Sequence, residues 1–306
     1  MAAATVVAAS RPRLWAFGLL AFLARGGLVI LIVPMLVLPT FVGISNIVGP
    51  TSVTAAGPTP RLVALIATWL GVGFAAMVAG SLVGAAAEVA LHRSAVAPGA
   101  DGAGSMLRSR LTWATGLPAR RATLRVAAVR LGLLLPVAIA IAAAVPAWVQ
   151  VAYRELLLPS DLAVPLPVRV VAGAPIPAAV VVATWLAAEA LGGLAARRIA
   201  LAGSSGTGAL KAAAGDVAHS PASTVLTLVV TIGGTLVVLV PAGVVVGGAW
   251  DHARAVLVEG TDGAGVIIAT LLLVAAWAGC LGVAGIVAAW RSALWTAELA
   301  RRARAG

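Results

Sequence analysis

The stretch from Val225 to Val246 reads VLTLVVTIGGTLVVLVPAGVVV and contains no charged residue. As a helix it would extend over about 33 Å, and the hydrocarbon core of a bilayer is about 30 Å thick. This stretch therefore predicts a transmembrane helix. Apolar runs of similar or slightly shorter length occur at Leu28–Val42, Leu62–Ala79, Ala178–Ala196 and Val266–Ala289.

The composition of the whole chain agrees with a membrane protein. Of the 306 residues, 61% are hydrophobic and only 10% are charged, whereas soluble domains carry about 25% charged residues. A soluble fold of this length could not hide so much apolar surface. The alternating ten-residue segments of a membrane β-barrel do not occur. We therefore expect an all-α polytopic membrane helix bundle.

About six transmembrane helices are expected, arranged as three hairpins with short cytoplasmic interfacial helices in a single membrane domain, 1–306. The hairpins cover about 13–91, 105–200 and 207–304. Their rising helices are expected at about 26–48, 121–153 and 221–248, and their returning helices at about 61–82, 177–196 and 263–290. A proline-rich loop joins the second pair, and residues 250–263 are expected to form the turn of the third.

Prolines mark both the starts and the interiors of these helices. In Thr59-Pro60 and Ser220-Pro221 a capping hydroxyl precedes a proline at the first helical position, which is a favourable helix start. Prolines inside predicted spans would end a soluble helix, but membrane bundles tolerate them as kinks. These internal prolines are Pro34, Pro39, Pro136, Pro146 and Pro241.

The basic residues predict the orientation in the membrane. With a cytoplasmic N-terminus, seventeen of the 21 basic residues fall in inner segments and four in outer loops, namely Arg61, Arg154, Arg169 and Arg254. This positive-inside bias predicts that both termini are cytoplasmic. Lys211 is the only lysine, a bias typical of a GC-rich, bacterial genome. We therefore expect a multi-pass protein of a bacterial cytoplasmic membrane.

Two short segments ahead of the second and third hairpins show a helical apolar stripe. They are Met106–Leu117 and Thr207–His219, and in the second the stripe is formed by Leu210, Ala214 and Val217. We expect both to lie as interfacial helices on the inner leaflet, with Arg13–Ala24 as a more apolar third example. The arginines expected to contact anionic headgroups are Arg108, Arg110, Arg120 and Arg121.

The three hairpins also share local patterns. Arg25-Gly26-Gly27 precedes Pro34 as Ile232-Gly233-Gly234 precedes Pro241, and the returning helices carry tryptophan in a similar setting, at Trp69, Trp185 and Trp277. A true threefold repeat and chance similarity between alanine- and valine-rich segments both fit this pattern. The three tryptophans are expected to pack between helices. The pair Gly80 and Gly84 is expected to permit close contact between helices of one chain or, less favourably, of two.

The sequence contains no recognisable catalytic or metal-binding motif. Lys211 is followed by Ala212, so no phosphate-binding loop is formed, and 203–206 is expected to be a flexible loop. His92, His219 and His252 are far apart and are expected at the surface or the interface. The acids of the outer loops, such as Glu155 and Asp161, are expected to be solvated, with cation attraction as the alternative. We expect no enzyme activity and no cofactor or metal; scattered basic residues also argue against nucleic acid as a partner.

Glu189 is the most conspicuous ionisable residue. It precedes Arg197 by eight residues, or about 12 Å of helix, which places it inside the hydrocarbon. An unpaired carboxylate costs about 2.5–3.5 kcal/mol there. Arg130 on the antiparallel rising helix is the best candidate partner. The pair is expected to fix the hairpin, with proton or ligand handling as the alternative.

Met106–Leu135 and Ala209–Val240 each contain a basic helix that leads through Gly-Leu-Pro or Ser-Pro into a span. This pattern resembles the integral-membrane domain attached to some glycerophosphodiester phosphodiesterases and its stand-alone bacterial relatives. The resemblance implies a six-helix membrane domain. No segment could supply the soluble phosphodiesterase barrel of that family, so its activity is not implied.

Two functions remain open from the sequence. We expect a scaffold or anchor that organises protein partners or lipids, with membrane lipids, another protein or a second copy of the chain as partner. The alternative is a transporter or permease subunit. Ala212-Ala213-Ala214-Gly215 resembles the coupling loop of ABC importer permeases, although it lacks the leading glutamate and its glycine comes early.

Overall fold

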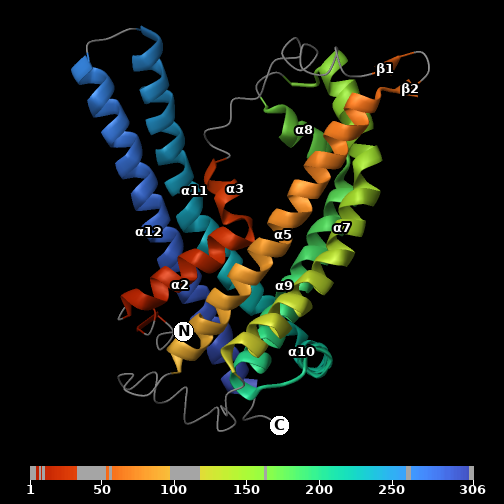
Figure 1. Ribbon diagram of the computed structural model, residues 1–306, viewed down its shortest axis with the longest axis vertical. Helices are drawn as coiled ribbons and strands as arrows, with labels where there is room; N and C mark the ends of the chain where they lie inside the picture. Colours follow the sequence, from red (N-terminus) through yellow and green to blue (C-terminus); the bar gives the residue numbers. More distant parts are fainter. Residues whose placement is uncertain are drawn as a thin grey trace. The chain divides into compact units, whose positions relative to one another are not determined.

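The computed structural model describes residues 5, 6, 8, 11–32, 53–54, 57–96, 118–161, 164–259 and 263–302. The described part is helical apart from one small antiparallel pair of strands, β1 (Val53–Thr54) and β2 (Gly57–Pro58) (Figure 1). Its helical elements are α2 (Pro12–Phe22), the π-helical turn η1 (Leu23–Gly27), α3 (Leu28–Ile32), α5 (Pro60–Ala95), α7 (Ala119–Leu157), α8 (Leu166–Gly173), α9 (Pro175–Ala202), α10 (Gly206–His219), α11 (Pro221–Glu259) and α12 (Gly263–Arg302).

Five of these helices, α5, α7, α9, α11 and α12, are long and apolar enough to cross a membrane. Large apolar side chains along them are exposed, as expected of helices whose solvent is lipid. The prediction of a multi-pass, all-helical membrane protein is confirmed at this level. Most of the predicted first rising helix, 26–48, lies outside the described residues.

The chain divides into two compact units. The first, unit 1, comprises Met1–Val7, Val89–Gly233 and Ser292–Gly306, and the second, unit 2, comprises Ala8–Glu88 and Gly234–Arg291. Helices α5, α11 and α12 contribute residues to both units. The expectation of a single membrane domain stays a prediction.

One helix start shows the predicted hydroxyl cap, and a second begins at the predicted proline. Helix α5 begins at Pro60, and the Thr59 hydroxyl accepts a hydrogen bond from the Leu62 N–H at 3.3 Å. Helix α11 begins at Pro221. Both α7 and α11 continue through the prolines inside them, Pro136, Pro146 and Pro241, as membrane helices can.

Unit 1 is built around the C-terminal half of α9, which packs against α7 and α10. Leu194, Ala195, Ala196 and Ile199 are completely buried. Glycine and alanine at half of the positions of this segment keep the helix thin, so neighbouring backbones approach closely. Helix α8, which packs on α7, lies inside the predicted proline-rich loop and was not foreseen.

A tight joint connects α9 to α10. Gly203 ends α9 in the left-handed conformation (φ 70°) and donates its N–H to the Ile199 carbonyl at 3.2 Å. The Ser205 hydroxyl then caps α10 by accepting from the Gly208 N–H at 3.2 Å. Arg125 of α7 donates to the carbonyls of Gly203 and Ser204, both at 3.1 Å. The segment 203–206, predicted to be a flexible loop, is therefore a short connection with a capping bond at each of its ends.

Helix α10 exists as predicted, but its inward face differs from the predicted one. Ala209 and Ala213 are completely buried, whereas Ala214 is exposed and Leu210 is only partly buried. The small side chains of Ala209 and Ala213 allow α10 to lie close to α9 and α7. The free energy gained from this close packing exceeds what the burial of Leu210 would contribute. The other predicted interfacial segment, Met106–Leu117, lies outside the described residues.

In unit 2 the short helix α2 crosses α12 at a pair of glycines (Figure 1). A Cβ atom on Gly18 would lie 2.7 Å from the Gly285 carbonyl oxygen, and one on Gly285 would lie 2.7 Å from the Trp15 carbonyl oxygen. Helix α2 ends in η1, where Gly26 takes φ 91° before α3 begins. A short helix therefore precedes the predicted first span, near the predicted segment Arg13–Ala24.

The third hairpin is longer than predicted. Trp250, Asp251, His252 and Arg254 belong to α11 rather than to a turn. No glycine or proline interrupts 249–259, so the helix can continue to Glu259. Helix α12 likewise extends beyond the predicted end at 290, to Arg302.

The predicted packing of the tryptophans holds for Trp277 only. Trp277 packs against buried Val246 and Cys280 of unit 2. Trp69 is 70% exposed and Trp185 is exposed as well, so the prediction is wrong for these two. Leu70 beside Trp69 is also exposed, which indicates that this part of α5 presents its apolar side chains to lipid.

Replacing Gly26 tests the kink at η1. A Cβ atom there would meet no other atom within 4 Å, so Gly26→Ala adds backbone strain alone. A left-handed non-glycine residue costs about 1–2 kcal/mol, so the unfolding temperature of the purified protein in detergent should fall. Gly71→Ala is the matched control, because Gly71 is equally open but lies in regular helix; this variant should be neutral or slightly stabilising. Equal effects of the two substitutions would contradict the kink.

Candidate functional site

Arg197 is a deeply buried arginine of unit 1, with 3% of its surface exposed. It lies on α9, and its guanidinium donates to the Gly193 carbonyl at 2.6 Å, one turn back on the same helix. Its other nitrogens donate to the Thr296 hydroxyl at 3.2 Å, and to the Ser292 carbonyl and hydroxyl at 3.0 and 3.3 Å. A buried cation needs such acceptors, so Arg197 fastens α9 to α12.

His92 of α5 extends this polar cluster. It is 1% exposed, and its Nδ1 lies 3.2 Å from the Ser292 hydroxyl oxygen. The cluster of His92, Arg197, Ser292 and Thr296 therefore joins three helices inside unit 1. The expectation of a surface or interfacial His92 is wrong, because the neighbouring Val89, Leu91 and Ala95 are buried as well. The spacing of Ser292 and Thr296, four residues apart on one face of α12, was the feature of the sequence that could have indicated a buried polar cluster.

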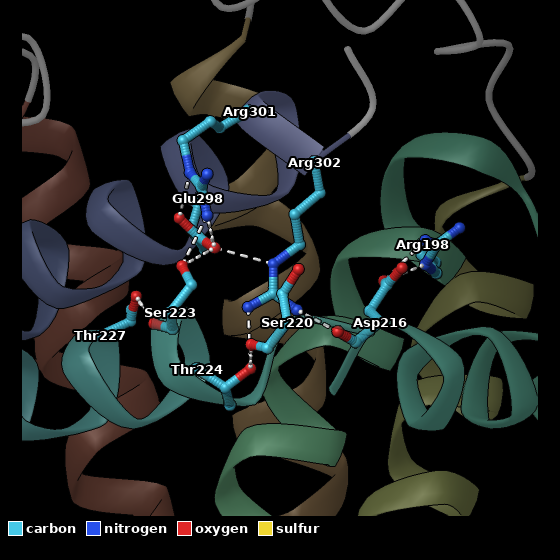
Figure 2. Close-up of polar contacts among 9 residues, drawn as sticks. All are labelled: Arg198, Asp216, Ser220, Ser223, Thr224, Thr227, Glu298, Arg301 and Arg302. Atoms are coloured by element: carbon cyan, nitrogen blue, oxygen red, sulfur yellow. Dashed lines mark hydrogen bonds and ion pairs between the residues drawn. The ribbon is translucent and has the colours of Figure 1, made fainter. Parts of the chain in front are cut away.

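A second polar group, the Glu298 network, lies where α9, α10, α11 and α12 meet (Figure 2). The Glu298 carboxylate accepts from Arg301 Nε and Nη2 at 3.0 and 2.8 Å and from Arg302 Nε at 2.7 Å. It also accepts from the Ser223 hydroxyl at 2.6 Å. This carboxylate therefore holds the C-terminal end of α12 to the first turn of α11.

Arg302 carries the network to the next helices. Its two terminal nitrogens donate to the Asp216 carbonyl at 3.0 Å and to the Thr224 hydroxyl at 2.8 Å. The side chain of Asp216 in turn forms an ion pair with Arg198 of α9 at 2.6 Å (Figure 2). Sequence reasoning did not single out these residues, because their partners lie on different helices.

The Glu298 carboxyl has a strongly lowered pKa. Glu298 lies two turns beyond Arg291, where the uncharged stretch of α12 ends, and so lies outside the predicted membrane-spanning segment. Burial opposes ionisation, but the hydrogen bonds from Arg301, Ser223 and Arg302 outweigh it and lower the pKa to about 2. The ionised carboxylate is therefore an integral part of the folded network.

The structure brings Glu189 and Arg130 together. Their Oε2 and Nη1 atoms are 3.6 Å apart, and the two side chains are 18% and 13% exposed. Helices α7 and α9, which carry them, pack side by side. A Cβ atom on Gly192 would collide with the Arg130 guanidinium, so this glycine leaves the space in which the arginine side chain lies.

The four arginines predicted to contact headgroups fall in two groups. Arg120 and Arg121 are exposed in the first turn of α7, and Arg108 and Arg110 lie outside the described residues.

In unit 2, Arg25 of η1 forms an ion pair with the buried Glu88 of α5. This pair was not predicted from the sequence.

The predicted outer-loop acid Glu155 has a structural place. It is buried in the last turns of α7 and accepts from the Ser160 N–H and hydroxyl at 3.0 and 2.9 Å. Arg169 of α8 lies 3.6 Å from the same carboxylate and donates to the Asp161 carbonyl. Glu155 is thus not a solvated loop acid as expected; it fastens the connection between α7 and α8.

The chemistry available in these clusters is ionic and hydrogen-bonding. Within the described parts of the chain, no group of three or more His, Cys, Asp or Glu side chains is placed to hold a metal ion. Comparisons with protein-family models, curated proteins and solved structures find no match. The function of these residues must therefore be inferred from the geometry of the ion pairs themselves.

The Glu298 network makes a prediction about acid stability. Because folding lowers the Glu298 pKa from 4.5 to about 2, its contribution to stability is complete above pH 4.5 and is lost as the pH falls toward 2. The unfolding temperature in detergent should therefore decline over that interval. In Glu298→Gln this part of the decline should be missing, and the protein should already be less stable at pH 7. An identical pH profile for both proteins would contradict the assignment.

Proposed function

We propose that the chain is a multi-pass scaffold or anchor of a bacterial cytoplasmic membrane, which organises lipids or protein partners and catalyses no reaction. The proposal is supported by the way in which the chain's buried charged side chains are held by hydrogen bonds and ion pairs within the fold. Arg197, Asp216 and Glu298 are all held by bonds of 2.6–3.3 Å to groups within unit 1. Charges committed to packing in this way support a rigid body better than a moving transport path.

We further propose six spans in three hairpins, with both termini in the cytoplasm. The five long apolar helices support five of the spans, and the apolar run Leu28–Val42 supports the first. The division of basic residues, seventeen against four, supports the orientation. The Glu298 network and the α9–α10 joint would then lie at the cytoplasmic side.

One observation favours a transporter as the second candidate. The ion pair of Glu189 and Arg130 lies between two apolar helices, has a separation longer than a hydrogen bond, and retains partial exposure. Intramembrane ionisable residues of this kind mark ion and proton pathways in many membrane proteins.

Reporter fusions test the topology. Fusions after residues 55, 164 and 261 should report the outer side, and those after 105, 204 and 306 the cytoplasm, because the positive-inside bias orients every hairpin alike. Paired reporters, one active only inside and the other only outside, give a positive signal at each site. A cytoplasmic signal at 164 would exclude the three-hairpin arrangement.

Glu189→Gln separates the two candidate functions. The substitution keeps the shape of the side chain and removes its titratable charge. In vesicles that contain a pH-sensitive dye, the scaffold proposal predicts that the wild-type protein carries no more protons than empty vesicles do. Breaking a buried ion pair costs about 3–5 kcal/mol; because this pair is partly exposed, Glu189→Gln should lose about 1–3 kcal/mol of stability.

Glu298→Gln serves as the control in the same vesicles, since it also removes one carboxylate but lies outside the apolar stretch of α12. Proton flux in the wild type that disappears in Glu189→Gln and persists in Glu298→Gln would overturn the scaffold in favour of the transporter.

A further inference from the structure

The basic residues near the α9–α10 joint fall into two classes. Arg125 and Arg198 are committed to the fold, the first to the carbonyls of Gly203 and Ser204 and the second to Asp216. Arg120, Arg121 and Lys211 are exposed. Among the residues that the structure describes, these three have no hydrogen-bond or ion-pair partner.

The three exposed cations sit on a rigid part of unit 1. Arg121 precedes Arg125 by one helical turn and so lies on the same face of α7, about 6 Å from it along the axis. Because Arg125 is bonded to the joint itself, and α10 packs on both α7 and α9, the first turn of α7 and helix α10 are held together. Lys211 lies on the side of α10 opposite its buried Ala209 and Ala213.

The exposed charge of this region is positive. The acidic side chain of α10, Asp216, is neutralised by Arg198, and Glu298 is neutralised by Arg301 and Arg302. The exposed residues of α10 are Thr207, Gly208, Lys211, Ala214, Ala218 and His219. None of them is a large apolar residue, whereas Leu210, next to Lys211, is only partly buried.

We propose that Arg120, Arg121 and Lys211 form a contact surface for anionic phospholipid headgroups, which binds them by charge. The occupant follows from the position of the surface. It lies at the start of α7 and at the joint that follows α9. Both helices are apolar enough to cross a membrane, so the nearest anions are headgroups of the same bilayer. The inference rests on the proposed membrane function and deepens it by naming the class of lipid.

The test uses the full chain purified in detergent, with phosphatidylglycerol and phosphatidylcholine of identical acyl chains offered together. Bound lipids are counted by native mass spectrometry. The wild type should retain phosphatidylglycerol in preference, and each of Arg120→Gln, Arg121→Gln and Lys211→Gln should lower that preference about fivefold, the equivalent of one charge near a membrane surface. Raising the salt from about 0.05 to about 0.5 M should weaken it as well.

Arg154→Gln is the matched control, because Arg154 is an exposed arginine at the other end of α7. It should leave the lipid preference unchanged. Equal binding of both lipids by the wild type, an equal loss in Arg154→Gln, or displacement of the lipid by inorganic phosphate would each overturn the surface. Unchanged unfolding temperatures would show that the variants fold. If the reporter topology holds while the lipid preference is absent, the lipid surface alone fails and the scaffold stands.

Discussion

The structure depends on one constraint: a polar or charged group among apolar helices must find its partners within the chain. Arg197 shows how far this constraint reaches. Its acceptors are a carbonyl of its own helix and the hydroxyls and carbonyl of Ser292 and Thr296 on α12. Because each acceptor has a fixed place on its helix, the arginine sets the register of α9 against α12. Apolar packing alone would leave that register loosely defined, since lipid competes for the same surfaces.

Small residues meet the same constraint, because they leave space for charged side chains and permit close contact between helices. Gly192 leaves the space occupied by the Arg130 guanidinium, and Gly18 and Gly285 bring two backbones together in unit 2. A methyl group at any of these positions would separate the helices or displace a charge. At these three positions glycine therefore permits close contact between helices or leaves room for a charged side chain.

Composition and local chemistry predicted the parts of this architecture that depend on neighbours in sequence. Apolar length located the long helices, and Thr59-Pro60 located a helix start. The depth of Glu189 pointed to Arg130 because both lie in one predicted hairpin. Features that join distant segments were not foreseen: the buried place of His92, the inward face of α10 and the Glu298 network each depend on a third helix.

The number and length of their contacts distinguish the charged residues that stabilise the fold from those that are candidates for a function. In the Glu298 network the bonds to the carboxylate are 2.6–3.0 Å long and come from several donors, so no single donor can leave without exposing a buried charge. Glu189 and Arg130 are 3.6 Å apart and lie between two apolar helices. The transporter alternative therefore depends on the contact of α7 with α9 rather than on the junction of α10, α11 and α12. The scaffold proposal requires that the ion pair of Glu189 and Arg130 also stays formed.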